Sequence, residues 1–179
     1  MIRPICRMGN PILRKKAKQV PKDILFSDSF AQLIEDLRDS MKEYGGIGIA
    51  APQIGIDMQV AIIELQGVNR YGEEINLPIT TFINPVMAFL TADTQGFWEG
   101  CLSVPGLRGY VERPRKVKVN FLNSRGEEEE IIAEGFLATV LQHELDHLEG
   151  ILYVDRIKDS RMLSYQEEFE EYLQEPKHE

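Results

Sequence analysis

The most informative stretch of this 179-residue chain is QHELDHLEG, residues Gln142–Gly150. If it is helical, the imidazoles of His143 and His147 lie on one face, one turn apart, and can hold a single metal ion. Glu144 follows the first histidine directly, so its carboxylate can reach a water in an open coordination position. Two histidine ligands with a general base are typical of metallohydrolases.

The residues around this stretch predict a helix. Gly150 lies where such a helix would end. Apolar residues recur at three- and four-residue spacing, at Phe136, Leu137, Val140, Leu141, Leu145 and Leu148. We therefore place the histidines on a helix.

A catalytic site of this kind usually has three protein ligands and one open position. The only other histidine, His178, lies in the polar C-terminal tail, so a cysteine is the best remaining soft ligand. Cys101 lies in FWEGCLSVPG, where extended backbone enters a turn. Cys6 has no acidic or histidine neighbour and is better explained as a small buried hydrophobe. The sequence favours Cys101 as the third ligand.

A glycine-rich stretch, GGIGIAAPQIG at residues 45–55, allows another backbone to approach closely. Its spacing is not that of a dinucleotide fingerprint, and it lacks the Lys-Ser/Thr ending of a phosphate loop. Gln53 is its one polar side chain. A tight turn after a helix explains the stretch equally well on its own.

Taken together, three segments resemble the motifs of the peptide deformylases in order and separation. Asn10–Arg14 and the hairpin from Lys116 to Glu134 extend the resemblance over most of the chain, up to about Arg156. The three motifs are GIGIAAPQIG (Gly46–Gly55), EGCLS (Glu99–Ser103) and QHELDHLEG (Gln142–Gly150).

The resemblance implies hydrolysis of the N-formyl group of nascent polypeptides, with formate released. It assigns Cys101, His143 and His147 to the metal and makes Glu144 the base that activates water. This ligand set suits Zn²⁺, Fe²⁺, Co²⁺ or Ni²⁺, and the family suggests Fe²⁺ as the native ion. The substrates that the resemblance implies are N-formyl-methionyl peptides.

The family also implies a substrate site. The Gln53 side chain and the Leu102 backbone N–H would stabilise the oxyanion. The backbone of Gly46, Ile47 and Gly48 would pair with the substrate as an added strand. Arg108 matches a family position near the substrate, although a solvated loop arginine explains it equally well.

The methionine side chain needs an apolar slot. Ile47 and Val140 are our candidates, because Val140 shares the helix face of His143. Phe97 and Phe136 are further candidates, for which ordinary core packing is the favoured explanation.

Ligand histidines usually donate their second N–H to a carboxylate or carbonyl. Glu99 and Asp146 are the nearby acids in the sequence. Asp146 would alternatively pair with Arg113 and hold the motif helix onto the strand segment.

The length of 179 residues fits one domain, which the resemblance makes a catalytic domain over residues 1–179, with residues 160–179 as a C-terminal helix and tail. Two cysteines give no disulfide framework, and a thiolate ligand needs a reducing setting, so we expect a cytoplasmic protein. No apolar run has membrane-spanning length. The net charge of −9 argues against direct nucleic-acid binding.

The predicted fold is α+β, with antiparallel strands packed around a central metal-binding helix. An N-terminal helix is expected over Ser29–Tyr44, capped by Asp28 and ended by Gly45, and a C-terminal helix over Ser160–Gln174 with Met162, Phe169, Tyr172 and Leu173 inward. Strands are expected at Met58–Glu64, Thr80–Asn84, Lys116–Leu122 and Glu130–Ala133.

The predicted C-terminal helix is acidic, so phosphates would repel it. If the protein docks on ribosomes, we expect another surface to make that contact.

Three alternatives stay open at this point. A zinc peptidase would take Glu167 or Glu168 as third ligand and would not need Cys101. A non-catalytic binding module with the same fold has no reason to keep Glu144. A related hydrolase would remove a larger acyl group.

Overall fold

The computed structural model of the chain describes residues 1–69, 72 and 74–174. His178 therefore lies outside the described residues. The helices are α1 (Asp28–Glu43), α2 (Gly135–Leu148) and α3 (Gln166–Glu168), which continues as a π-helix over Phe169–Leu173. The strands are β1 (Gly48–Ala50), β2 (Val60–Val68), β3 (Glu74–Phe89), β4 (Thr94–Cys101), β5 (Val104–Pro114), β6 (Lys116–Leu122), β7 (Glu128–Glu134) and β8 (Leu163–Tyr165).

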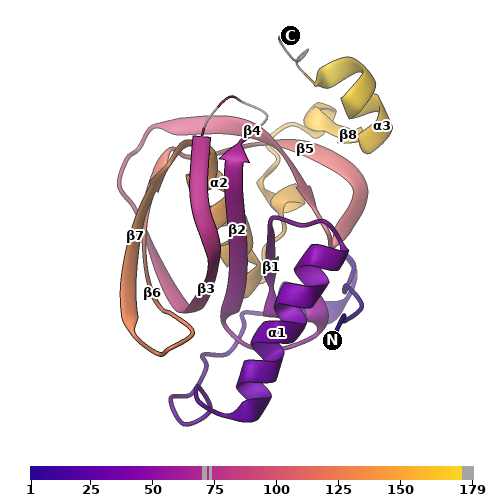
Figure 1. Cartoon of the computed structure of the whole chain (residues 1–179). Helices are drawn as coiled ribbons and strands as arrows, with labels where there is room; N and C mark the ends of the chain where they lie inside the picture. The colour runs from indigo at the N-terminus through magenta and orange to yellow at the C-terminus, as the bar shows by residue number, and fades with distance from the viewer. Residues whose placement is uncertain (70–71, 73, 175–179) are drawn as a thin grey trace.

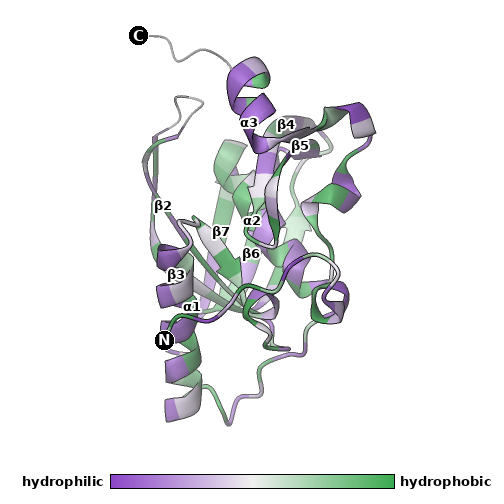
Figure 2. Ribbon diagram, turned by 90° about the vertical axis from the view of Figure 1, so that its right-hand side faces the viewer, coloured by the Kyte–Doolittle hydropathy of each residue, from purple (hydrophilic) through white to green (hydrophobic). Residues whose placement is uncertain are grey.

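The described strands form two antiparallel sheets around α2, as the sequence predicts. One sheet has the order β1-β2-β3-β6-β7, and the other has the order β4-β5-β8. Helix α1 covers one face of the larger sheet, while α2 lies behind it (Figure 1). Figure 2 shows α2 between the larger sheet and the β4–β5 strands. None of the helices in the described residues combines the length and apolarity needed to span a bilayer.

Strand β2 connects the two halves of the core because both of its faces are buried. Successive side chains of a strand point to opposite faces. Ala61 and Ile63 accordingly pack with α2, while Val60 and Ile62 pack with α1. The apolar run VAII is therefore buried throughout. A smaller cluster joins β5 to the segment before α1 and the segment after α2, through Leu13, Val104, Val111, Leu152 and Tyr153.

Helix α1 begins one residue earlier than predicted, and its cap is a different residue. The Ser27 hydroxyl accepts a hydrogen bond from the backbone N–H of Phe30 at 3.2 Å, so Ser27 is the N-cap and Asp28 is the first helical residue. The prediction of Asp28 as the cap was wrong. Gly45 follows the helix with φ +67°, a conformation that glycine adopts without strain.

The sequence located four strands and missed four. Lys116–Leu122 agrees at both ends, and the predicted Thr80–Asn84 strand lies inside the longer β3. The turn at residues 123–126 closes the β6–β7 hairpin, with Asn123 N–H donating to Glu127 O at 2.9 Å. Strands β1, β4, β5 and β8 are rich in glycine or short, so the alternation that marks a strand is weak in them.

The predicted C-terminal helix over Ser160–Gln174 was wrong in its first half. A 3₁₀ turn at Ser160–Met162 leads into β8, which pairs with β5 before α3 begins. Backbone pairing with β5 overrides the local helical pattern. Phe169 is buried as predicted, but Tyr172 and Leu173 are exposed.

Two phenylalanines of β3 provide a matched test of the core. Phe82 is fully buried and packs on Phe121 with ring centroids 4.4 Å apart, whereas Phe89 is 61% exposed. Phe82→Ala should lower the free energy of unfolding by about 3–5 kcal/mol, and Phe89→Ala by less than about 1 kcal/mol. Urea unfolding measures both. Equal losses would contradict the described core.

Candidate metal and substrate site

Helix α2 holds both motif histidines inside the protein. Its residues from Ala138 to Leu148 are all buried, because sheets lie on both flanks. His143 and His147 lie one turn apart with ring centroids 5.1 Å apart. The helix ends at Leu148, and Gly150 follows with φ +75°, as the sequence predicts.

Cys101 reaches the two histidines from the end of β4. The β4–β5 pairing shifts its register between Glu99 and Cys101, which turns the thiol toward α2. The Cys101 Sγ lies 3.4 Å from His147 Nε2. The ligand atoms of Cys101, His143 and His147 all lie within 4.8 Å of one another. The three predicted ligands thus converge, although they come from segments over forty residues apart.

The two histidines favour the thiolate form of Cys101. Burial disfavours the thiolate, but the electrostatic influence of His147 and His143 and their hydrogen bonds hold the pKa of Cys101 well below its usual range. The thiolate is the form that binds metals.

Glu99 fixes the orientation of His143. Its Oε2 lies 2.7 Å from His143 Nδ1, and Arg113 donates to both carboxylate oxygens at 2.6 and 3.0 Å. Burial opposes ionisation, yet the hydrogen bonds from His143 and Arg113 lower the pKa of Glu99 to about 2. An ionised carboxylate only accepts, so Nδ1 carries the proton and Nε2 is left for a metal.

Asp146 accepts hydrogen bonds from two arginines, one of which it shares with Glu99. Arg113 Nη1 donates to Asp146 Oδ2 at 2.8 Å, and Arg156 Nη2 donates to Asp146 Oδ1 at 2.7 Å. Arg113 therefore lies between the two acids and ties β5 to β4 and α2. The sequence left open whether Asp146 binds a ligand histidine or Arg113. The structure pairs it with Arg113.

Glu144 lies against the backbone of β1. A Cβ at Gly48 would collide with the Glu144 carboxylate, so this position accepts only glycine without rearrangement. Burial raises the pKa of Glu144 above its ordinary value. Its Oε2 is buried and has no hydrogen-bond partner among the described residues. A buried acceptor without a partner is costly, which points to a ligand or water at this atom.

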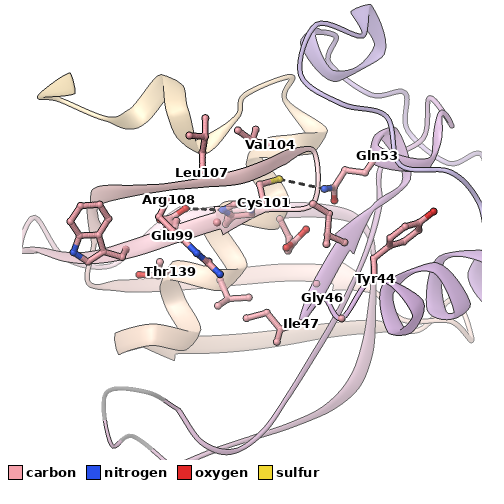
Figure 3. Close-up of a pocket in the computed structure, with 18 of the residues that line it drawn as sticks. Tyr44, Gly46, Ile47, Gln53, Glu99, Cys101, Val104, Leu107, Arg108 and Thr139 are labelled. Carbon is pink, nitrogen blue, oxygen red and sulfur yellow. Dashed lines mark hydrogen bonds and ion pairs between the residues drawn. The ribbon is translucent and has the colours of Figure 1, made fainter. Parts of the chain in front are cut away.

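Gln53 is held with its amide N–H₂ toward the site. Its Oε1 accepts from Ala50 N–H at 2.8 Å, so Nε2 faces Ser103 Oγ at 3.2 Å and Cys101 Sγ at 3.5 Å. Figure 3 shows Gln53 on one side of Cys101 and Arg108 on the other.

A cleft of about 350 Å³ opens onto these groups. Its walls include predicted substrate residues from all three motif regions, namely Gly46, Ile47, Gly48, Leu102, Arg108 and Val140. Ile47 is 44% exposed at the cleft wall. Phe136 also lines the cleft, whereas Phe97 packs edge-on against Phe136 at 5.4 Å and is not among the lining residues.

The structure adds residues that the sequence did not indicate. Tyr153 stacks on His143 with centroids 6.0 Å apart, and Arg156 completes the partners of Asp146. Trp98 and Gln166 line the cleft. Trp98 lies directly before the EGCLS motif, which is a signal that could have been used, but nothing in the sequence marks Gln166.

The residues fit a transition-metal ion. One thiolate and two imidazoles are the donor set that such ions take, and the unpartnered Glu144 oxygen lies beside it. Glu167 and Glu168, the ligands of the peptidase alternative, do not join the Cys101 group among the described residues.

An α+β fold whose central helix presents two histidines and a buried glutamate, with a cysteine added from β4, defines a metal-dependent hydrolase. The chain belongs to the peptide deformylase family, because the Polypeptide deformylase family model matches residues 2–162. Members of this family remove the N-formyl group from nascent polypeptides, and this chain is a hydrolase of that kind.

Relatives match over nearly the whole chain. It is 41% identical to a peptide deformylase of Leptospira biflexa over 170 residues, covering 94% of this chain and 95% of that protein. It is 45% identical to peptide deformylase 1 of Prochlorococcus marinus, covering 94% and 88%. The Met-Ala-Ser-bound class I type b peptide deformylase of Acinetobacter baumannii superposes with a TM-score of 0.83 at 38% identity, covering 88% and 99%.

The Arg113 network makes a stability prediction. Arg113→Met leaves the buried Glu99 and Asp146 carboxylates without their shared cation, and should lower the free energy of unfolding by about 3–5 kcal/mol. Arg115→Met, which breaks an exposed pair with Glu134, should cost less than about 1 kcal/mol. Chemical denaturation compares the two variants. A similar small loss for both would mean that the network does not stabilise the fold.

Gly48 makes a second prediction. Gly48→Ala must displace the Glu144 carboxylate, so kcat/KM for a formyl-peptide should fall roughly 100-fold or more. The metal content should not change, because none of the nearest atoms at Gly48 belongs to Cys101, His143 or His147. Formate release and metal analysis on the same sample separate the two effects. Wild-type activity in this variant would contradict the described packing.

Proposed function

We propose that each residue of this site has a distinct role in the deformylation reaction. Cys101, His143 and His147 hold one divalent metal ion. The observation that carries the proposal is the buried, unpartnered Oε2 of Glu144 next to these three donors. When bound, the ion would supply Lewis-acid chemistry, polarising the formyl carbonyl and lowering the pKa of water.

Glu144 is the general base and then the general acid. It accepts a proton from the water whose oxygen attacks the formyl carbon. It then delivers that proton to the departing nitrogen as the C–N bond breaks, leaving formate and a free amine. Burial raises the pKa of Glu144, which brings the carboxylate closer to the acidity that a base needs near neutral pH.

Two donors stabilise the oxyanion that develops on the formyl oxygen. Gln53 Nε2 is already aimed at the Cys101 side of the cleft, because Ala50 holds the other end of the amide. The Leu102 backbone N–H is the second donor. Removing one such donor typically costs about 2.7–4 kcal/mol of transition-state stabilisation.

The peptide lies along the free edge of β1. Strand β1 pairs with β2 on one side, through Gly48↔Ile63 and Ala50↔Ala61. The backbone of Gly46, Ile47 and Gly48 can add the substrate as a further strand. The exposed side chain of Ile47 and the buried Val140 form the walls for the methionine side chain.

We further propose Fe²⁺ as the native ion, with Zn²⁺, Co²⁺ or Ni²⁺ as substitutes, and the cytoplasm as the location. The substrates are N-formyl-methionyl nascent chains. If the protein meets them at the ribosome, the acidic residues Glu167, Glu168, Glu170 and Glu171 make another surface the better docking site.

Glu144 and Cys101 make the decisive test. Protein purified without oxygen should release formate from formyl-Met-Ala-Ser. Glu144→Ala should abolish release, by at least ~100-fold, with metal still bound, because the base is lost and the ligands stay. Cys101→Ala should lose both metal and activity.

Formate assay and metal quantification on each variant give the answer. A fully metallated wild type that releases no formate would overturn the proposal and point to a different acyl substrate. A Cys101→Ala variant that keeps its metal and its activity would contradict the role of Cys101 as a ligand. It would favour the metal site of the peptidase alternative, which does not need the thiol.

A further inference from the structure

The C-terminal segment, residues 163–173, lies beyond the part of the chain that matches the family model and yet packs against the cleft. Its strand β8 pairs with β5 through Leu107↔Tyr165 and Arg108↔Ser164. Its Phe169 is 2% exposed and packs on Trp98 with ring centroids 5.1 Å apart. Backbone pairing and a buried aromatic contact thus hold the segment in one position.

Gln166 joins this segment to Arg108. The Gln166 Oε1 accepts a hydrogen bond from Arg108 Nε, while its Nε2 donates to Glu170. A carboxylate oxygen only accepts, so Glu170 fixes which end of the amide faces Arg108. The guanidinium is planar, and a bond at Nε therefore restrains the direction of the whole group.

The held guanidinium lies over the substrate cleft. A Cβ at Gly100 would collide with the Arg108 guanidinium, so the side chain crosses the β4 backbone directly beside Cys101. Among the described residues that line the cleft, Arg108 is the one lysine or arginine. Gln166 and Trp98 line the same cleft. Figure 3 shows Arg108 on the side of Cys101 away from Gln53.

We infer that the C-terminal segment is a working part of the peptide cleft, and that Gln166 is a positioning residue for Arg108. The inference rests on the proposed function. Gln166 holds the guanidinium so that it can donate to backbone carbonyl oxygens of the residues after the formyl-methionine. Gln166 thus favours longer peptides without touching the reacting atoms.

The test compares Gln166→Leu with Glu167→Leu, a change at the exposed neighbouring residue. Two substrates are used, formyl-Met-Ala-Ser and formyl-methionine amide, which lacks the following residues. Gln166→Leu should raise KM for the tripeptide roughly 3- to 10-fold with kcat within about twofold. Both constants for formyl-methionine amide should stay within about twofold, as should every constant of Glu167→Leu.

Arg108→Lys and the double variant test whether Gln166 acts through Arg108. Lysine keeps the charge but loses the planar group that Gln166 orients. The double variant should then be no worse than Arg108→Lys alone. Fully additive losses, an unchanged KM in Gln166→Leu, or equal losses on both substrates would each overturn the inference.

Trp98 is the only tryptophan of the chain, and its emission reports on the seating of the segment. If the Gln166→Leu variant has the same emission as the wild type, the substitution has not displaced the C-terminal segment. If the emission differs, Gln166→Met is used in place of Gln166→Leu. Titrating Met-Ala-Ser by this signal also gives an affinity that does not depend on turnover.

If the wild type releases no formate, the proposed function fails, and the affinity then decides the inference. A 3- to 10-fold weaker Met-Ala-Ser affinity in Gln166→Leu supports it, and an unchanged affinity overturns it. If the wild type releases formate and Gln166→Leu behaves like it, only the inference fails.

Discussion

The ion pair between Glu99 and Arg113 is the interaction on which the site depends. Both side chains are buried, and a buried charge without an opposite charge beside it would destabilise the fold. Glu99 comes from β4 and Arg113 from β5, and Glu99 also holds His143 on α2 at 2.7 Å. One carboxylate thereby sets the tautomer of a proposed metal ligand and joins the smaller sheet to the central helix. Arg113 extends the same connection to Asp146.

Close backbone approach is the second constraint on the site. Gly48 lets the Glu144 carboxylate lie against β1, and Gly100 lets Arg108 cross β4. In both places an ionisable side chain occupies the space that a Cβ would fill. The two glycines line the cleft, one on the edge strand of the larger sheet and one on the smaller sheet. The cleft is therefore shaped by missing side chains as much as by those present.

Parts of the fold that the sequence predicted share one property, which is that their signal is local. Helix α2 and hairpin β6–β7 have strong apolar periodicity or a clear turn, and both appear where they were expected. Strands β4, β5 and β8 carry weak local signals, because their stability comes from pairing with each other. The same reason explains the error at residues 160–165, where pairing with β5 overrides a helical pattern.

The histidine spacing, the glutamate beside the first histidine, the preference for Cys101 over Cys6 and, through the family resemblance, the class of reaction could all be read from the sequence. Helical spacing places residues four apart on one face in any protein, so no tertiary information was needed. Three contacts became known only from the folded chain: Glu99 holds His143, Asp146 binds Arg113 and Arg156, and Gln166 binds Arg108. Most of those contacts join segments that lie far apart in the chain, and the packing of α2 against β4 and β5 and the pairing of β5 with β8, which local sequence does not encode, bring them together.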